Sequence, residues 1–172
     1  MKKPLCIIKY FLVMLLSGIS FVSFAQTPTD TLPGDPGGLY AYTIQNINLG
    51  AFSHGSAGGT LTIAADGTRT STGDIVPLNL GVSYYNAIFE IEAPPGAIIS
   101  ILNGPDATLT GSNGGSMSLH IGSPTPASPF NNIVPPPGRT QVSIGGTLTI
   151  GGAGAAPPGA YSGTIYITFN HE

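Results

Sequence analysis

The feature that most constrains this chain is a set of short segments in which every second residue is apolar. In one segment Leu61 and Ile63 alternate with threonines, and in another Met117, Leu119 and Ile121 alternate with serine and histidine. Successive side chains of a strand point to opposite faces, so this period of two predicts strands with one buried face. No window keeps a helical period over the ~12 residues of a typical helix, and prolines interrupt each candidate. The pattern therefore predicts an all-β chain.

The same alternation predicts further strands along the chain. They cover residues 87–91, 142–144 and 148–150 and a closing strand over 161–169, with additional candidates at 40–49, 75–80, 98–102 and 107–110. About nine or ten short strands joined by turns every 8 to 12 residues or so are typical of an antiparallel sandwich or barrel. We favour the sandwich.

Turn residues separate these segments. Hairpins are predicted at Ala65-Asp66-Gly67, Asn103-Gly104 and Asn113-Gly114, because Asn, Asp and Gly tolerate positive φ. Residues 123–139 contain six prolines and are too long for a hairpin loop. This segment is expected to be either a crossover between sheets or a surface loop with its own shape.

One hexapeptide occurs twice. Gly58-Gly59-Thr60-Leu61-Thr62-Ile63 is repeated letter for letter at 145–150, although the flanking sequences do not align. A duplicated half-sandwich is one explanation. Independent use of a Gly-Gly bend before an apolar/Thr alternation is the other, and we favour it.

The first 25 residues have the pattern of a secretory signal peptide. Lys2, Lys3 and Lys9 precede a 15-residue apolar stretch that ends in Ser23-Phe24-Ala25. That stretch is shorter than the roughly 20 residues of a membrane-spanning helix, so no membrane span is expected in the mature chain; a signal-anchor is the alternative. We expect export to the periplasm, the cell surface or the medium.

Cleavage after Ala25 would change the composition. The mature chain would keep Arg69 and Arg139 against eight carboxylates and would lose Cys6, its one thiol. This predicts no nucleic-acid binding, no disulfide and no cysteine chemistry. Residues 26–38, rich in Pro and Gly, are expected to form a flexible leader, within which Asp30-Thr31-Leu32 also fits a short O-glycosylation pattern. A single domain would then span residues 39–172.

Several motifs resemble a known family. They are Phe52, the two Gly-Gly-Thr-Leu motifs, Gly67-Thr68-Arg69, residues 73–78, 87–89 and 142–150, and the closing stretch Pro158-Gly159-Ala160-Tyr161-Ser162-Gly163-Thr164-Ile165. Together they resemble domain-of-unknown-function 4402 of exported bacterial proteins over most of 39–169, and the last stretch also resembles spore coat protein U and pilus-type subunits. The resemblance implies an immunoglobulin-like, pilin- or adhesin-like sandwich at the cell envelope, and it supplies no catalytic residue.

The sequence argues against catalysis. His54 is expected in a loop, His120 on the polar side of a strand, and His171 at a frayed chain end, and no nucleophile elbow is present. Glu90 and Glu92 lie at i, i+2 on one strand face, which is typical of a solvated outer face rather than of a glycosidase pair. We therefore expect no enzyme, no catalytic residue and no cofactor.

Binding residues are harder to predict. Asp35, Asp66, Asp74 and Asp106 are scattered and are expected to form turns, so no metal site is predicted, although loop oxygens could converge on calcium. The best candidates for ligand contact are the tyrosines, which combine a flat apolar face with a polar tip: Tyr40, Tyr42, Tyr84 and Tyr85. Tyr84 and Tyr85 must point to opposite faces, so at least one of them is expected to pack in the core or at an edge.

Two functions remain open from the sequence. The favoured one is a non-enzymatic envelope protein with a structural or adhesive role, like a fimbrial subunit, whose partners are other envelope or fimbrial proteins or surface glycans. The alternative is a secreted carbohydrate- or calcium-binding module. The oligomeric state is not predicted.

Overall fold

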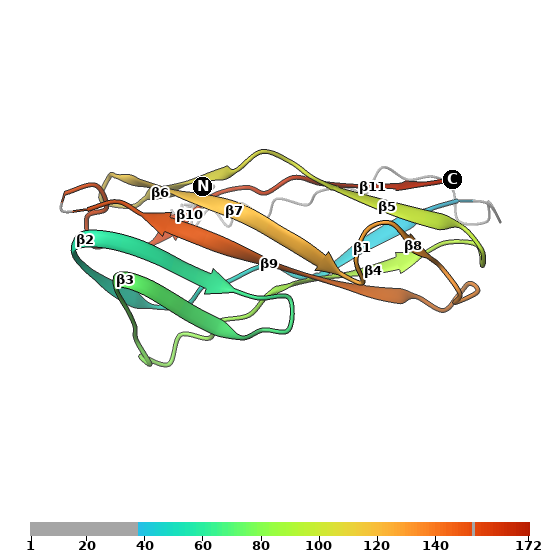
Figure 1. Ribbon diagram of the computed structural model, residues 1–172, viewed down its shortest axis with the longest axis horizontal. Helices are drawn as coiled ribbons and strands as arrows, with labels where there is room; N and C mark the ends of the chain where they lie inside the picture. The colour runs from blue at the N-terminus through green and yellow to red at the C-terminus, as the bar shows by residue number, and fades with distance from the viewer. Residues whose placement is uncertain (1–37, 153) are drawn as a thin grey trace, which may run out of the picture. The chain divides into compact units, whose positions relative to one another are not determined.

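Eleven strands and no helix make up the described part of the computed structural model, residues 38–152 and 154–172 (Figure 1). All strand pairs are antiparallel. The strands are β1 (Tyr40–Gln45), β2 (Phe52–Ile63), β3 (Arg69–Pro77), β4 (Ala87–Glu92), β5 (Ile98–Asn103), β6 (Ala107–Gly111), β7 (Ser116–Thr125), β8 (Phe130–Asn131), β9 (Thr140–Ile150), β10 (Tyr161–Ser162) and β11 (Ile167–His171). The all-β, antiparallel prediction is confirmed. The predicted signal peptide, residues 1–25, and all but the last residue of the predicted leader, residues 26–38, lie outside the described residues.

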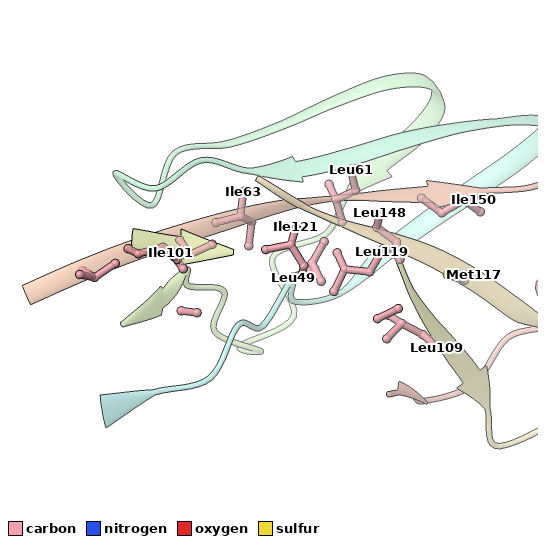
Figure 2. Close-up of a cluster of buried hydrophobic side chains, with 14 of the residues drawn as sticks. Leu49, Leu61, Ile63, Ile101, Leu109, Met117, Leu119, Ile121, Leu148 and Ile150 are labelled. Atoms are coloured by element: carbon pink, nitrogen blue, oxygen red, sulfur yellow. The ribbon is translucent and has the colours of Figure 1, made fainter. Parts of the chain in front are cut away.

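The strands form two sheets. The eight-stranded sheet has the order β1-β4-β9-β7-β6-β10, with β2 paired to β9 and β3 paired to β2. The three-stranded sheet has the order β11-β5-β8. One core contains buried residues of both sheets, including Leu61, Leu119 and Leu148 from the larger sheet and Ile101 from the smaller one (Figure 2). Because the predicted apolar positions of β2, β7 and β9 are all buried, burial of these alternating residues accounts for the main stabilising contacts.

β9 is the strand around which the larger sheet is organised. Its first half pairs with β4, from Thr140 opposite Ile91 to Ile144 opposite Ala87, and its second half pairs with β2. β7 lies along its other side (Figure 1). β9 therefore changes partner at Gly145.

The two copies of the repeated hexapeptide pair with each other. The register places Leu61 opposite Leu148, so each copy runs antiparallel to the other about a shared centre. A Cβ on Gly58 would lie 2.4 Å from the carbonyl oxygen of Ile150, and a Cβ on Gly145 would lie 2.1 Å from that of Ile63. The first glycine of each copy thus packs against the last residue of the other. Each copy needs glycine there because the two backbones approach too closely for a side chain.

Two of the three predicted hairpins are present. Between β2 and β3, Gly67 has a φ of 84°, its N–H donates to the Ala64 carbonyl at 2.9 Å, and the Thr68 N–H donates to Asp66 Oδ1 at 2.8 Å. Between β6 and β7, Gly114 has a φ of 86°. The prediction at Asn103-Gly104 is wrong, because β5 and β6 belong to different sheets. The Asn103 amide instead donates to the Gly122 carbonyl at 2.9 Å.

Some strand boundaries also differ from the predictions. The candidate over 75–80 overlaps only the end of β3, which begins six residues earlier and ends at Pro77. The candidate over 40–49 ends at Gln45 apart from an isolated bridge between Asn48 and Tyr85. The closing strand is not continuous: β10 pairs with β6 in the larger sheet, whereas β11 pairs with β5 in the smaller one. Gly163 lies between β10 and β11, where the chain passes from the larger sheet to the smaller one. A Cβ on Gly163 would lie 2.6 Å from the Thr108 carbonyl oxygen, so the chain passes in close contact with the backbone of β6.

The proline-rich segment 123–139 is a crossover between sheets. It leaves β7 in the larger sheet, contributes β8 to the smaller one, and returns to β9. Asn132, 1% exposed, fixes this path: its amide nitrogen donates to the carbonyls of Ala93, Pro94 and Val134 at 2.6, 3.2 and 2.9 Å, and its Oδ1 accepts from Thr140 Oγ1 at 2.8 Å. A single buried side chain therefore satisfies polar groups of three segments.

Candidate functional site

A pocket of about 350 Å³ lies where the beginning of β2 approaches the segment before β10. Phe52, Leu78 and Met117 contribute apolar walls, and Leu80, 70% exposed, lies at the rim. The full lining is Gly50, Ala51, Phe52, Ser53, His54, Leu78, Leu80, Met117, Ala156, Pro157, Pro158, Gly159 and Tyr161. The lining contains no carboxylate, lysine or arginine, so the pocket suits an uncharged, largely apolar group.

Two polar side chains hold one wall of the pocket. The His54 ring places Nε2 2.9 Å from the Ala156 carbonyl oxygen and Nδ1 3.1 Å from that of Gly55. The Tyr161 hydroxyl donates to the Pro157 carbonyl at 2.7 Å. Both rings thus tie residues 156–158 to β2 and β10. Their polar atoms are engaged with the protein backbone, so they position the wall rather than reach into the pocket.

Arg69 contacts two segments next to the pocket. Its Nη2 donates to the Ala51 carbonyl at 2.6 Å, and its guanidinium lies 5.0 Å from the centroid of the Tyr84 ring. Burial lowers the pKa of Arg69, and the Tyr84 hydroxyl acts in the opposite direction. The buried Nε has no hydrogen-bond partner among the described residues. Arg69 therefore links Ala51, which directly precedes β2 and lines the pocket, to the loop that carries Tyr84 and Leu80.

The four predicted tyrosines fall into two separate pairs. Tyr40 and Tyr42 lie on β1, opposite Glu92 and Glu90 of β4, whereas Tyr84 and Tyr85 lie in the connection between β3 and β4. Tyr85 bonds through its backbone to Asn48, at 2.8 and 2.9 Å. Tyr84 is 48% exposed. The structure therefore does not bring the four rings into one site.

Tyr42 belongs to a charged cluster on the outer face of the larger sheet. The Arg139 guanidinium lies 4.0 Å from the centroid of the Tyr42 ring, and it donates to Glu90 at 3.1 Å and to Glu92 at 3.4 Å. The hydrogen bond to Glu90 is the main cause that raises the pKa of Arg139. Because the guanidinium satisfies both carboxylates, this cluster is arranged as an ion-pair network, and one face of Tyr42 is covered.

The histidines and aspartates occupy places that the sequence predicted only in part. His54 lies in β2, not in a loop, and His171 pairs with Ile99 at the end of β11 rather than fraying. His120 is exposed as predicted, with Nδ1 2.7 Å from Asp106 Oδ1. Asp74 lies in β3 and accepts the Ala57 N–H at 3.1 Å, so it does not form a turn.

No three His, Cys, Asp or Glu side chains in residues 38–152 and 154–172 come together in a group that could hold a metal ion. The same part of the chain has no helix of the length and apolarity required to span a bilayer.

Sequence reasoning missed the pocket because four distant segments contribute its walls. Phe52 and Tyr161 each had a local signal, as aromatic residues at the start of a strand, but no sequence spacing relates them to Met117.

Comparison with known proteins gives a family without an assigned activity. No curated protein and no solved structure matches the chain. The family model for a domain of unknown function, DUF4402, matches residues 41–171, which include every strand from β2 to β11 and all but the first residue of β1. The chain therefore belongs to the DUF4402 family.

Proposed function

We propose that this chain is a non-enzymatic protein of the bacterial envelope with a structural or adhesive role, acting through its surfaces and strand edges. The observation that carries the proposal is the composition of two edge strands. β1 pairs only with β4 and β11 only with β5 among the described residues, and neither strand contains Lys, Arg, Asp, Glu or Pro. Soluble monomers usually protect such edges with charges, prolines or bulges.

The sequence supports the same proposal. The chain has no lysine after Lys9, and lysine is the residue that most often protects sheet edges. A bulge between Thr43 and Gln45 is the one irregularity of this kind in β1. The edges therefore remain suited to pairing with a strand of another molecule.

Lysine substitutions at the two edges test this role. Thr43→Lys in β1 and Thr168→Lys in β11 place charges on exposed edge positions, and Thr149→Lys places the same charge on an exposed position of the central strand β9. Analytical ultracentrifugation over a concentration series should show self-association of the unsubstituted protein and of Thr149→Lys, with weaker association of the edge variants. A protein that stays monomeric at high concentration and binds no envelope component would contradict the proposal.

The carbohydrate-binding alternative has less support. Its strongest surface is the cluster around Tyr42, where paired carboxylates lie beside an aromatic ring, but Arg139 covers one face of that ring. A glycan array with the unsubstituted protein and with Tyr42→Ala tests this alternative. Binding that Tyr42→Ala abolishes would favour it over the structural role.

A further inference from the structure

The first residues of β2 have a backbone edge that no described strand covers. Opposing residues of an antiparallel pair alternately turn their N–H and C=O groups toward the partner strand and away from it. The Leu78 N–H donates to the Ala51 carbonyl at 2.9 Å, so Ala51 and Ser53 face β3. Phe52 and His54 then direct their backbone groups to the other side.

β9 does not reach that side of β2. Its pairing with β2 begins at Gly59, opposite Ile150, and continues only toward Ile63. Over residues 38–152 and 154–172, no strand pairs with the outward backbone groups of Phe52 and His54. No described strand therefore pairs with this stretch of β2, residues 52–54, which we call the open edge.

The open edge and the pocket share residues. Phe52, Ser53 and His54 line the pocket and also form the open stretch of β2. Backbone N–H and C=O groups that can hydrogen-bond to an added strand thus lie beside the largely apolar pocket. This combination matches strand addition, in which backbone hydrogen bonds give affinity and pockets for alternate side chains give specificity.

We propose that this site binds an extended, uncharged segment of a partner protein, which adds as a strand to β2 and inserts one apolar side chain into the pocket. The lack of charged side chains in the lining selects against a charged insert, because an unpaired charge there would lose its hydration. The proposal rests on the proposed function, since it names one surface through which an envelope protein would make contacts.

Binding of synthetic peptides tests the proposal. The probe is a fluorescein-labelled peptide of eight residues in which threonine alternates with an apolar residue, prepared with leucine, valine, methionine, phenylalanine or glutamate at the central position. Fluorescence polarisation should show binding of the apolar probes and about tenfold weaker binding of the glutamate probe, equivalent to roughly 1.4 kcal/mol. Methylation of alternate amide nitrogens, on the edge that would pair with β2, should weaken binding by a similar factor.

Two leucine variants locate the binding. Leu80→Lys places a charge at the rim of the pocket, and Leu102→Lys places the same charge at a comparably exposed leucine of β5, outside the pocket lining. Both residues are more than half exposed, so both variants should fold, which thermal melting by circular dichroism checks. Leu80→Lys should weaken peptide binding about tenfold, as the glutamate probe does, and Leu102→Lys should leave it unchanged.

The results separate this proposal from the proposed function. Peptides that do not bind, or that bind equally well with methylated amides, would overturn strand addition at β2. Equal loss in Leu80→Lys and Leu102→Lys would also overturn it, because binding would then not depend on the pocket. If Leu80→Lys still self-associates, the proposed envelope role is supported independently of whether the peptides bind.

Discussion

The two halves of β9 pair with different strands and are held in different ways. The first half, next to β4, begins beside the buried amide of Asn132 and the ion pairs of Arg139. The second half, next to β2, has no charged side chain and relies on glycines that let two identical segments approach closely. The comparison shows that one strand can be fixed by polar and charged side chains at one end and by close backbone approach at glycines at the other.

Gly145→Ala should reduce the stability of the fold most, because Gly145 lies where β9 changes its pairing from β4 to β2. The new Cβ would lie 2.1 Å from the Ile63 carbonyl oxygen, so the β2–β9 pairing must separate. We expect a loss of about 4 kcal/mol in the free energy of unfolding, measured by urea denaturation with circular dichroism. Gly122→Ala is the control, since its Cβ would meet nothing closer than 3.4 Å. Equal stability of the two variants would contradict the role of close approach.

Asn132→Ala tests the first half of β9. Removing the amide leaves the buried Ala93 carbonyl and the Thr140 hydroxyl without this partner, and each unsatisfied buried group costs about 1 to 3 kcal/mol. We expect a loss of about 3 kcal/mol in urea denaturation. Asn131→Ala, at the exposed neighbouring position, should change stability little. A loss below 1 kcal/mol or so for Asn132→Ala would show that the backbone alone fixes the crossover.

Thr62 and Thr147 give a smaller test in the second half. Their hydroxyl oxygens lie 3.0 Å apart across the β2–β9 pair. A double-mutant cycle with Thr62→Val and Thr147→Val should give a coupling of about 0.5 kcal/mol, as expected of a cross-strand pair. No coupling would mean that the two copies are held by backbone and apolar contacts alone.

Asp66 should have the smallest effect, confined to acid. The hydrogen bond from the Thr68 backbone N–H is the main cause that lowers the pKa of Asp66 in the folded chain. Ionised Asp66 therefore stabilises the fold above the unfolded value of about 4, and this contribution is lost as the pH falls through the lower folded value. Asp66→Asn should show a smaller decrease of stability below about pH 4 than the unsubstituted protein. Identical pH profiles in thermal melts would contradict this assignment.

The sequence predicted the elements whose signal is local. The alternation in β2, β4, β7 and β9 identifies both the strands and their buried faces, because burial follows the period of two. The Asp66 and Asn113-Gly114 turns were predictable for the same reason, since their residues set the backbone conformation directly.

Other features depend on contacts that a sequence pattern does not contain. The alternation continues from Tyr161 to Phe169 although the chain changes sheet between β10 and β11. Asn132 lies in a proline-rich segment with no period, and its role follows only from the carbonyls that surround it. The repeat of the hexapeptide is visible in the sequence, but the sequence does not indicate that the two copies pair with each other.

The positions of the two arginines make limited trypsin digestion a separate probe of each half of β9. After Lys9, Arg69 and Arg139 are the chain's only basic residues at which trypsin can cut. Arg139 directly precedes the first half of β9, and Arg69 begins β3, the strand that supports β2 and through it the second half. Cleavage at either arginine requires local opening of that region. The sizes of the first fragments will therefore report which half of β9 opens first.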